Sequence, residues 1–213
     1  MKFPSQVRFV PWVGSSYDSG LKGAKTLILG ESHYQKDGKA YSRNLNIELI
    51  SGQANKTGIY LGRYPFWTKI IKLVSPSDTD PHRFWNSVAY YNYIQEFVGL
   101  VARERPTGIM WKDAQKPFYE VLSLLKPDFI LALGTNLWNS LPCDYCSDAG
   151  GELGSLYCKY IIDDQTIIAA KTRHPSSFGF KYSEWQPRVE YGFNVAIKHK
   201  EAEQARRAAQ MLR

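Results

Sequence analysis

The sequence predicts an α/β fold: a three-layer sandwich with a central, mainly parallel four-stranded sheet. The first observation is that short apolar runs of strand length alternate with longer segments of helical periodicity. Such alternation is typical of an open parallel sheet whose connecting helices cover both faces. The second is size and composition, because 213 residues with 44% hydrophobic side chains suit one domain with a full core. We therefore expect a single domain over residues 1–213.

Four apolar runs are the predicted strands of this sheet. Each has the length of a strand and is followed by glycine or a polar residue that begins a loop or a helix. The runs cover residues 25–29, 87–91, 128–134 and 166–170.

The segments between these runs are predicted to be helical. In residues 65–74 the apolar side chains fall on one helical face. The helix after residue 134 is expected to begin with Thr135 or Asn136 as its cap. Residues 1–24 are expected to be irregular. The remaining predicted helices cover residues 44–50, 111–126 and about 184–213, and the last of them is strongly basic.

The net charge favours a polyanionic partner. Lys and Arg number 27 against 20 Asp and Glu, which gives +7 and a pI near 9.2. Neutralising phosphates releases counterions, so this excess favours nucleic acid, and we expect DNA. No signal peptide and no apolar run of membrane-spanning length are recognised, so we expect a cytoplasmic protein without membrane association. We also expect it to be a monomer.

The three cysteines do not predict a disulfide framework, since their number is odd. Cys143, Cys146 and Cys158 have the spacing of three metal ligands, but a structural zinc site needs four. We expect free thiols, no metal and no cofactor.

Polar segments follow three of the predicted strands. In parallel sheets the ligand crevice lies at the carboxyl ends of the strands, so Glu31, Asn92 and His174 are expected around one cleft. A carboxylate facing an imidazole suits a reaction that separates charge, such as cleavage of an N-glycosidic bond. An Asn side chain can read a base edge by donating one hydrogen bond and accepting another. Taken singly, each residue has an ordinary alternative: a solvated loop carboxylate, a turn cap and a strand end.

Together and in order, these residues resemble a known family. The segment Gly30-Glu31-Ser32-His33-Tyr34 resembles the first motif of uracil-DNA glycosylases, and His174-Pro175-Ser176 resembles their second. Asn92 stands where the family has its base-reading Asn. The likeness covers about residues 25–195.

The resemblance implies a role for each matching residue. Glu31 would position or activate water and stabilise the cationic sugar, while His174 would donate a hydrogen bond to the departing base. Asn92 would read the pyrimidine edge, and Tyr34 would exclude the methyl group of thymine. Phe178, or else Phe180, would be the wedge that enters the duplex. Gly30 and Ser32 would complete the base site, and the DNA contacts would come from Arg173, Pro175, Ser176 and Ser177.

Some features remain open or depart from the family pattern. The aromatic residue that would stack on the base could be Tyr41, Tyr60, Tyr64 or Phe66. In the first motif, His33 replaces a proline and Ser32 replaces the aspartate of one branch, so the carboxylate has to be Glu31. A modified pyrimidine is therefore considered beside uracil as the target.

Three functions compete at this stage. The first is a DNA glycosylase, and the second is a catalytically silent nucleic-acid-binding protein of the same fold. The third is a hydrolase of free nucleosides or nucleotides. The pair Glu31 and His174 favours an enzyme, while the positive charge and Phe178 favour a polymeric substrate.

Overall fold

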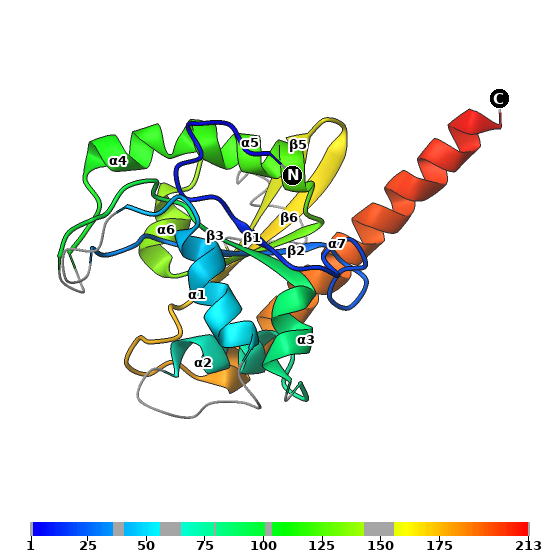
Figure 1. Cartoon of the computed structure of the whole chain (residues 1–213). Helices are drawn as coiled ribbons and strands as arrows, with labels where there is room; N and C mark the ends of the chain where they lie inside the picture. The colour runs from blue at the N-terminus through cyan, green and yellow to red at the C-terminus, as the bar shows by residue number, and fades with distance from the viewer. Residues whose placement is uncertain are drawn as a thin grey trace.

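The protein is built around one twisted sheet with helices on both faces (Figure 1). The computed structural model describes residues 2–35, 41–55, 65–78, 80–100, 104–142 and 156–212. Within these ranges no helix has the length and apolar content that crossing a membrane would require.

The sheet has six strands in the order β1-β3-β2-β4-β6-β5. The four middle strands run parallel and are the four that the sequence predicts. Both edge strands are antiparallel to their neighbours, so the expectation of four strands has to be corrected to six. The strands are β1 (Trp12–Val13), β2 (Thr26–Gly30), β3 (Val88–Asn92), β4 (Phe129–Leu133), β5 (Tyr157–Ile162) and β6 (Gln165–Thr172).

The two edge strands lack the apolar run that identified the others. β1 has only two residues, which is too short for any periodicity. β5 joins β6 through a two-residue turn in which Asp163 and Asp164 both have positive φ, at 47° and 60°. This is the left-handed pair that a tight hairpin turn requires, and Asp tolerates it better than most residues.

Helices lie where the sequence predicts them, with shifted ends, and one more helix, α3 (Pro81–Asn86), was not predicted. The segment predicted as one helix over 111–126 is two helices that meet at Ala114. The helix after β4 begins at Thr135 with Gly134, at φ of 124°, as its N-cap residue, so neither Thr135 nor Asn136 caps it. The basic C-terminal helix begins at Tyr182. The helices are α1 (Leu45–Ala54), α2 (Phe66–Val74), α3 (Pro81–Asn86), α4 (Gly108–Asp113), α5 (Gln115–Leu125), α6 (Thr135–Ser140) and α7 (Tyr182–Met211).

The core consists of two apolar layers, one on each face of the sheet. Leu27 and Leu29 of β2 pack with α5 and the N-terminal segment, while Ile28 packs on the opposite face with α2, α3 and α7. Because both faces are covered, every residue of β2 is buried. This explains why the parallel strands are continuous apolar runs and not alternating ones.

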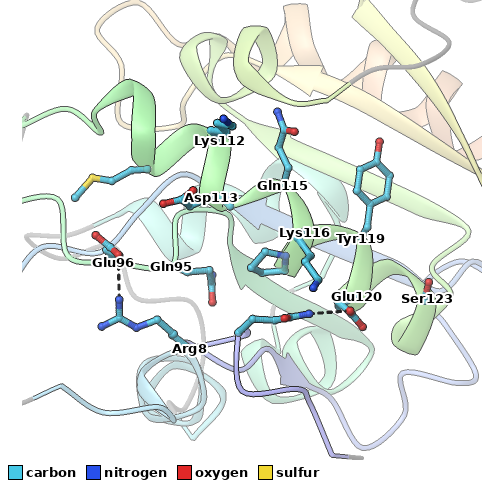
Figure 2. Close-up of a pocket in the computed structure, with 14 residues that line it drawn as sticks. Arg8, Gln95, Glu96, Lys112, Asp113, Gln115, Lys116, Tyr119, Glu120 and Ser123 are labelled. Atoms are coloured by element: carbon cyan, nitrogen blue, oxygen red, sulfur yellow. Dashed lines mark hydrogen bonds and ion pairs between the residues drawn. The ribbon is translucent and has the colours of Figure 1, made fainter.

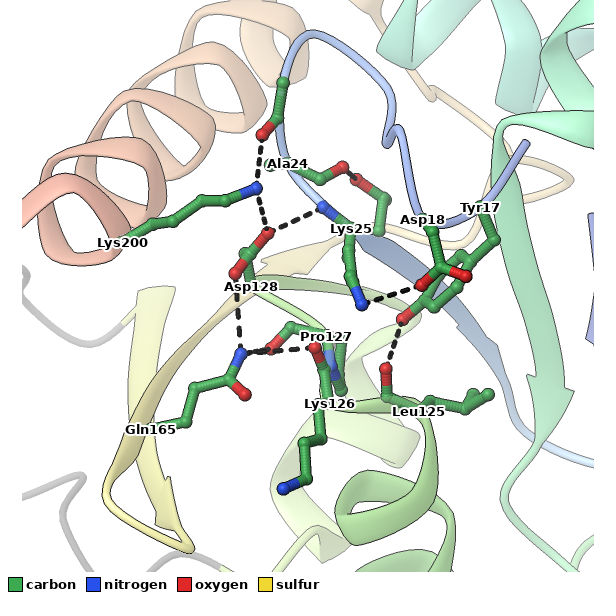
Figure 3. Close-up of polar contacts among 12 residues, drawn as sticks. Tyr17, Asp18, Ala24, Lys25, Leu125, Lys126, Pro127, Asp128, Gln165 and Lys200 are labelled. Atoms are coloured by element: carbon green, nitrogen blue, oxygen red, sulfur yellow. Dashed lines mark hydrogen bonds and ion pairs between the residues drawn. The ribbon is translucent and has the colours of Figure 1, made fainter. Parts of the chain in front are cut away.

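A buried carboxylate joins the elements at the amino ends of the parallel strands (Figure 3). Asp128 Oδ2 accepts a hydrogen bond from the backbone N of Lys25 at 2.8 Å and pairs with Lys200 Nζ of α7 at 3.0 Å. Gln165 Nε2 donates to the other oxygen at 3.4 Å. These bonds connect β2, β4, β6 and α7 at the end of the sheet opposite the candidate site.

Candidate functional site

The strand order places a possible ligand crevice at the carboxyl ends of β2 and β4. After β2 the chain adds β3 on one side of β2. It then returns and adds β4, followed by β6, on the other side of β2. Ligands of open parallel sheets bind where the strand order reverses in this way. The segments that begin at Glu31, Gly134 and Arg173 leave β2, β4 and β6 at this edge.

The loop after β2 is held close to the chain that follows β3. The backbone N of Ile94 donates to the carbonyl of Glu31 at 2.9 Å, and that of Val98 donates to the carbonyl of His33 at 3.0 Å. A Cβ atom on Gly30 would lie 2.0 Å from Asn92 Oδ1. Glycine is therefore needed at position 30 for the close approach of Asn92.

A network of buried polar side chains supports this loop. Asn46 Nδ2 donates to the carbonyls of Phe9 and Val10, and its Oδ1 lies 2.8 Å from His33 Nε2. Because that oxygen only accepts, the proton of His33 is on Nε2 and Nδ1 is an acceptor. Asn92 Nδ2 lies 3.2 Å from Nδ1 and can donate to it. Burial lowers the pKa of His33 from 6.5 to about 4, so the ring is neutral at pH 7.

Asn92 uses both ends of its amide inside this network. Nδ2 donates to the carbonyl of Ser32 at 3.2 Å as well as to His33, and Oδ1 accepts from the Tyr90 hydroxyl at 2.9 Å. The residue is only 4% exposed. Reading a base would require Asn92 to give up some of these bonds, so this role stays a prediction that the geometry does not favour.

Glu31 has a largely covered side chain, which is only 15% exposed. Burial raises the pKa of its carboxyl, and the charge of Arg105 opposes that rise. Arg105 Nη1 lies 3.4 Å from Glu31 Oε1. The carboxylate is thus held in a partly desolvated position with one cation beside it, where its charge acts strongly on a ligand.

His174 is fixed by the turn that it begins. Its Nδ1 accepts the backbone N–H of Ser176 at 3.2 Å, so in the neutral ring the proton is on Nε2. The ring stacks on Phe66 of α2, with centroids 5.1 Å apart and an interplanar angle of 14°. A Cβ atom added to Gly134 would lie 3.6 Å from the Cβ of His174, so His174 lies over the end of β4. Burial lowers the pKa of His174, and the charges of Arg105 and Lys69 lower it further.

The loop after His174 ends in an exposed aromatic tip. The carbonyl of His174 accepts from the backbone N of Ser177 at 2.8 Å, which closes a turn, and Lys69 Nζ donates to the carbonyl of Pro175 at 2.9 Å. Phe178 is 99% exposed and is followed by Gly179 in a left-handed conformation, with φ of 72°. Arg173 and Ser176 are also exposed. The exposed Phe178 ring therefore does not contribute to the core, although hydrogen bonds hold the loop that carries it.

The other residues predicted for the base site are Tyr34 and the four aromatic stacking candidates. Tyr34 packs against the core on the α5 side of the sheet. Of the four stacking candidates, Tyr60 and Tyr64 lie outside the described residues, as do Cys143 and Cys146. Of the two described candidates, Phe66 stacks on His174, whereas the hydroxyl of Tyr41 donates to the carbonyl of Arg8.

One functional candidate was missed by the sequence reasoning. Arg105 lies well beyond the end of β3 in the chain, and the residues around it match no motif. Only the fold brings it to Glu31. The third cysteine, Cys158, is buried in β5, and the described residues hold no cluster of three metal-ligating side chains.

A surface hollow of about 900 Å³ lies between the N-terminal segment and helices α4 and α5 (Figure 2). Hydrogen bonds at 2.7 and 3.1 Å join Gln6 to Glu120 and Arg8 to Glu96. Neither Glu31 nor His174 lines it. Three cations and three anions surround the hollow, so its charges do not favour phosphate. The cations are Arg8, Lys112 and Lys116, and the anions are Glu96, Asp113 and Glu120.

A scan of the chain against protein-family models gives no match, and no curated protein matches its sequence significantly. Function is therefore inferred from the side-chain geometry and the motifs.

Proposed function

We propose that this chain is a DNA glycosylase of the uracil-DNA glycosylase type, which hydrolyses the N-glycosidic bond of uracil or a related modified pyrimidine. The observation that carries the proposal is that two loops at the strand-order reversal carry a carboxylate and an imidazole. Glu31 follows β2 with a partly desolvated carboxylate, and His174 lies over the end of β4 with its proton on Nε2. The reaction needs an anion that faces the sugar and a neutral donor that faces the base.

The reaction breaks the bond between the sugar C1′ and the base nitrogen. The sugar becomes cationic as the base leaves with negative charge. Ionised Glu31 would stabilise the cation and orient the water that adds to C1′. The Nε2–H of His174 would donate to the carbonyl oxygen of the departing base. The proton released from the water balances the charge on the base, so no metal or redox group is required by the stoichiometry.

The loop tip and the net charge support DNA as the substrate. A base inside a duplex is reached only after extrusion, and an apolar wedge fills the gap that it leaves. Phe178 is fully exposed and Arg173 lies five residues before it on the same loop. With a net charge of +7, the chain attracts the phosphate backbone.

Cleavage of a panel of oligonucleotides tests the proposal. Single- and double-stranded oligonucleotides would carry uracil or one of several modified pyrimidines, and alkali would convert abasic sites into strand breaks. We expect breaks with the wild type, few with Glu31→Gln and wild-type amounts with Glu96→Gln. Glu96 is a suitable control because it is also paired with an arginine, Arg8, but lines the hollow of Figure 2. Absence of breaks on every base would refute the proposed activity.

One set of contacts favours the second candidate, a binding protein that does not cut. Both ends of the amide of Asn92, the predicted base reader, are already engaged within the protein. DNA binding that is retained without any strand break in the same assay would support this alternative.

A further inference from the structure

Arg105 is the charged side chain that, among the described residues, acts on both proposed catalytic groups. Its guanidinium pairs with Glu31, and its charge also acts on His174. Lys69 of α2 is the other cation whose charge acts on His174, and its Nζ donates to the carbonyl of the next residue, Pro175, at 2.9 Å.

The position of Arg105 is set by the start of α4. Thr107 caps this helix by accepting the backbone N–H of Met110 at 3.3 Å, and Arg105 lies two residues before the cap. The side chain of Arg105 is 62% exposed, whereas that of Glu31 is 15% exposed. The guanidinium is therefore the solvent-exposed partner of this ion pair.

We propose that Arg105 is a positioning residue of this site, which holds the Glu31 carboxylate in place through their ion pair. This inference rests on the proposed function. A nearby cation favours the ionised carboxyl and the neutral imidazole at once. Glycosidic cleavage needs this combination, because an anion has to face the sugar and a neutral donor has to face the base.

Burial acts differently on the two groups. In Glu31 it favours the protonated form, so Arg105 opposes it, whereas in His174 burial and Arg105 both favour the neutral ring. Removing the cation should therefore raise the pKa of both groups. A purely structural arginine would not move both titrations in the same direction.

The first test follows the two titrations directly, without DNA. Carboxyl ¹³C signals of Glu31 and imidazole ¹⁵N signals of His174 would be followed against pH by NMR in the wild type, Arg105→Met and Arg105→Lys. We expect both titrations to move to higher pH in Arg105→Met and to return toward the wild type in Arg105→Lys. Arg8→Met is the matched control, because Arg8 forms a similar exposed pair with Glu96, and it should move neither. A Glu31 titration that is unchanged in Arg105→Met would overturn the inference.

The second test measures single-turnover cleavage. The rate ratio of wild type to Arg105→Met should grow severalfold between about pH 7.5 and about pH 5, since Glu31 is protonated earlier in the variant. A constant ratio would overturn the inference. If no variant cleaves any base, the proposed function fails, while the NMR titrations still decide the role of Arg105.

Discussion

The stability of the folded protein should depend on pH through the buried His33. The perturbation is acidification from pH 7.5 to pH 4, compared between the wild type and His33→Gln. In the unfolded chain His33 takes up a proton near pH 6.5, whereas in the folded protein its pKa is about 4. Within this window protons bind the unfolded state preferentially, so the free energy of unfolding falls as the pH is lowered.

The magnitude follows from the two pKa values. Their difference, 6.5 to about 4, corresponds at 1.36 kcal/mol per pKa unit to about 3 kcal/mol. The loss begins near pH 6.5 and is complete below about pH 4. Glu31 has a raised pKa, so its contribution has the opposite sign: it is present at low pH and is lost as the pH rises through its folded pKa. The comparison with the variant cancels this second contribution.

Urea unfolding at several pH values, followed by tryptophan fluorescence, measures the effect. Gln at position 33 can still donate to Asn46 but does not titrate, so His33→Gln should lack the His33-dependent fall, although it is less stable at pH 7. His82→Gln is the control, since His82 is exposed, and it should keep the wild-type dependence. Parallel curves for the wild type and His33→Gln would refute the lowered pKa that burial gives His33.

Four further substitutions test the site itself. Glu31→Gln should reduce single-turnover cleavage on the order of a hundredfold or more while leaving DNA affinity intact, because it removes the charge and little volume; a fully active variant would assign the water to another group. His174→Ala should cost about 3 kcal/mol in the transition state, seen as a slower chemical step with unchanged binding of abasic DNA; weaker binding with a normal rate would contradict its role. Asn92→Asp loses the donor to Ser32 and His33 and should destabilise the protein by about 1–3 kcal/mol in urea unfolding; a stable variant with a changed base preference would instead restore Asn92 as the base reader. Phe178→Ala should slow duplex cleavage far more than single-strand cleavage with no change in stability, since the ring is 99% exposed; equal losses on both substrates would remove the wedge.

The sequence by itself determined the centre of the fold. The runs at 25–29, 87–91, 128–134 and 166–170 predict the parallel strands because burial on both faces requires nearly every side chain to be apolar. The edge strands β1 and β5 could not be found in this way. One is two residues long, and the other depends on pairing with β6 across the Asp163-Asp164 turn.

The sequence also predicted which loops carry the site, because polar residues after parallel strands gather at one edge. Glu31 and His174 were found by this reasoning, and both lie at the carboxyl edge of the sheet. The roles of their neighbours depended on the tertiary structure. Whether an Asn reads a ligand or supports a loop is decided by its partners, and those of Asn92 come from Ser32, His33 and Tyr90.

Two features were decided by the tertiary structure alone. Arg105 lies 74 residues from Glu31 in the chain, and no local pattern predicts a contact over that separation. His33 could be seen as a departure from a motif, but its neutral state depends on burial and on its contact with Asn46, which lies in α1. Local sequence determines which segments become strands and helices, because that depends on periodicity. Charge states and partners depend on groups that only the folded chain brings within a few ångströms.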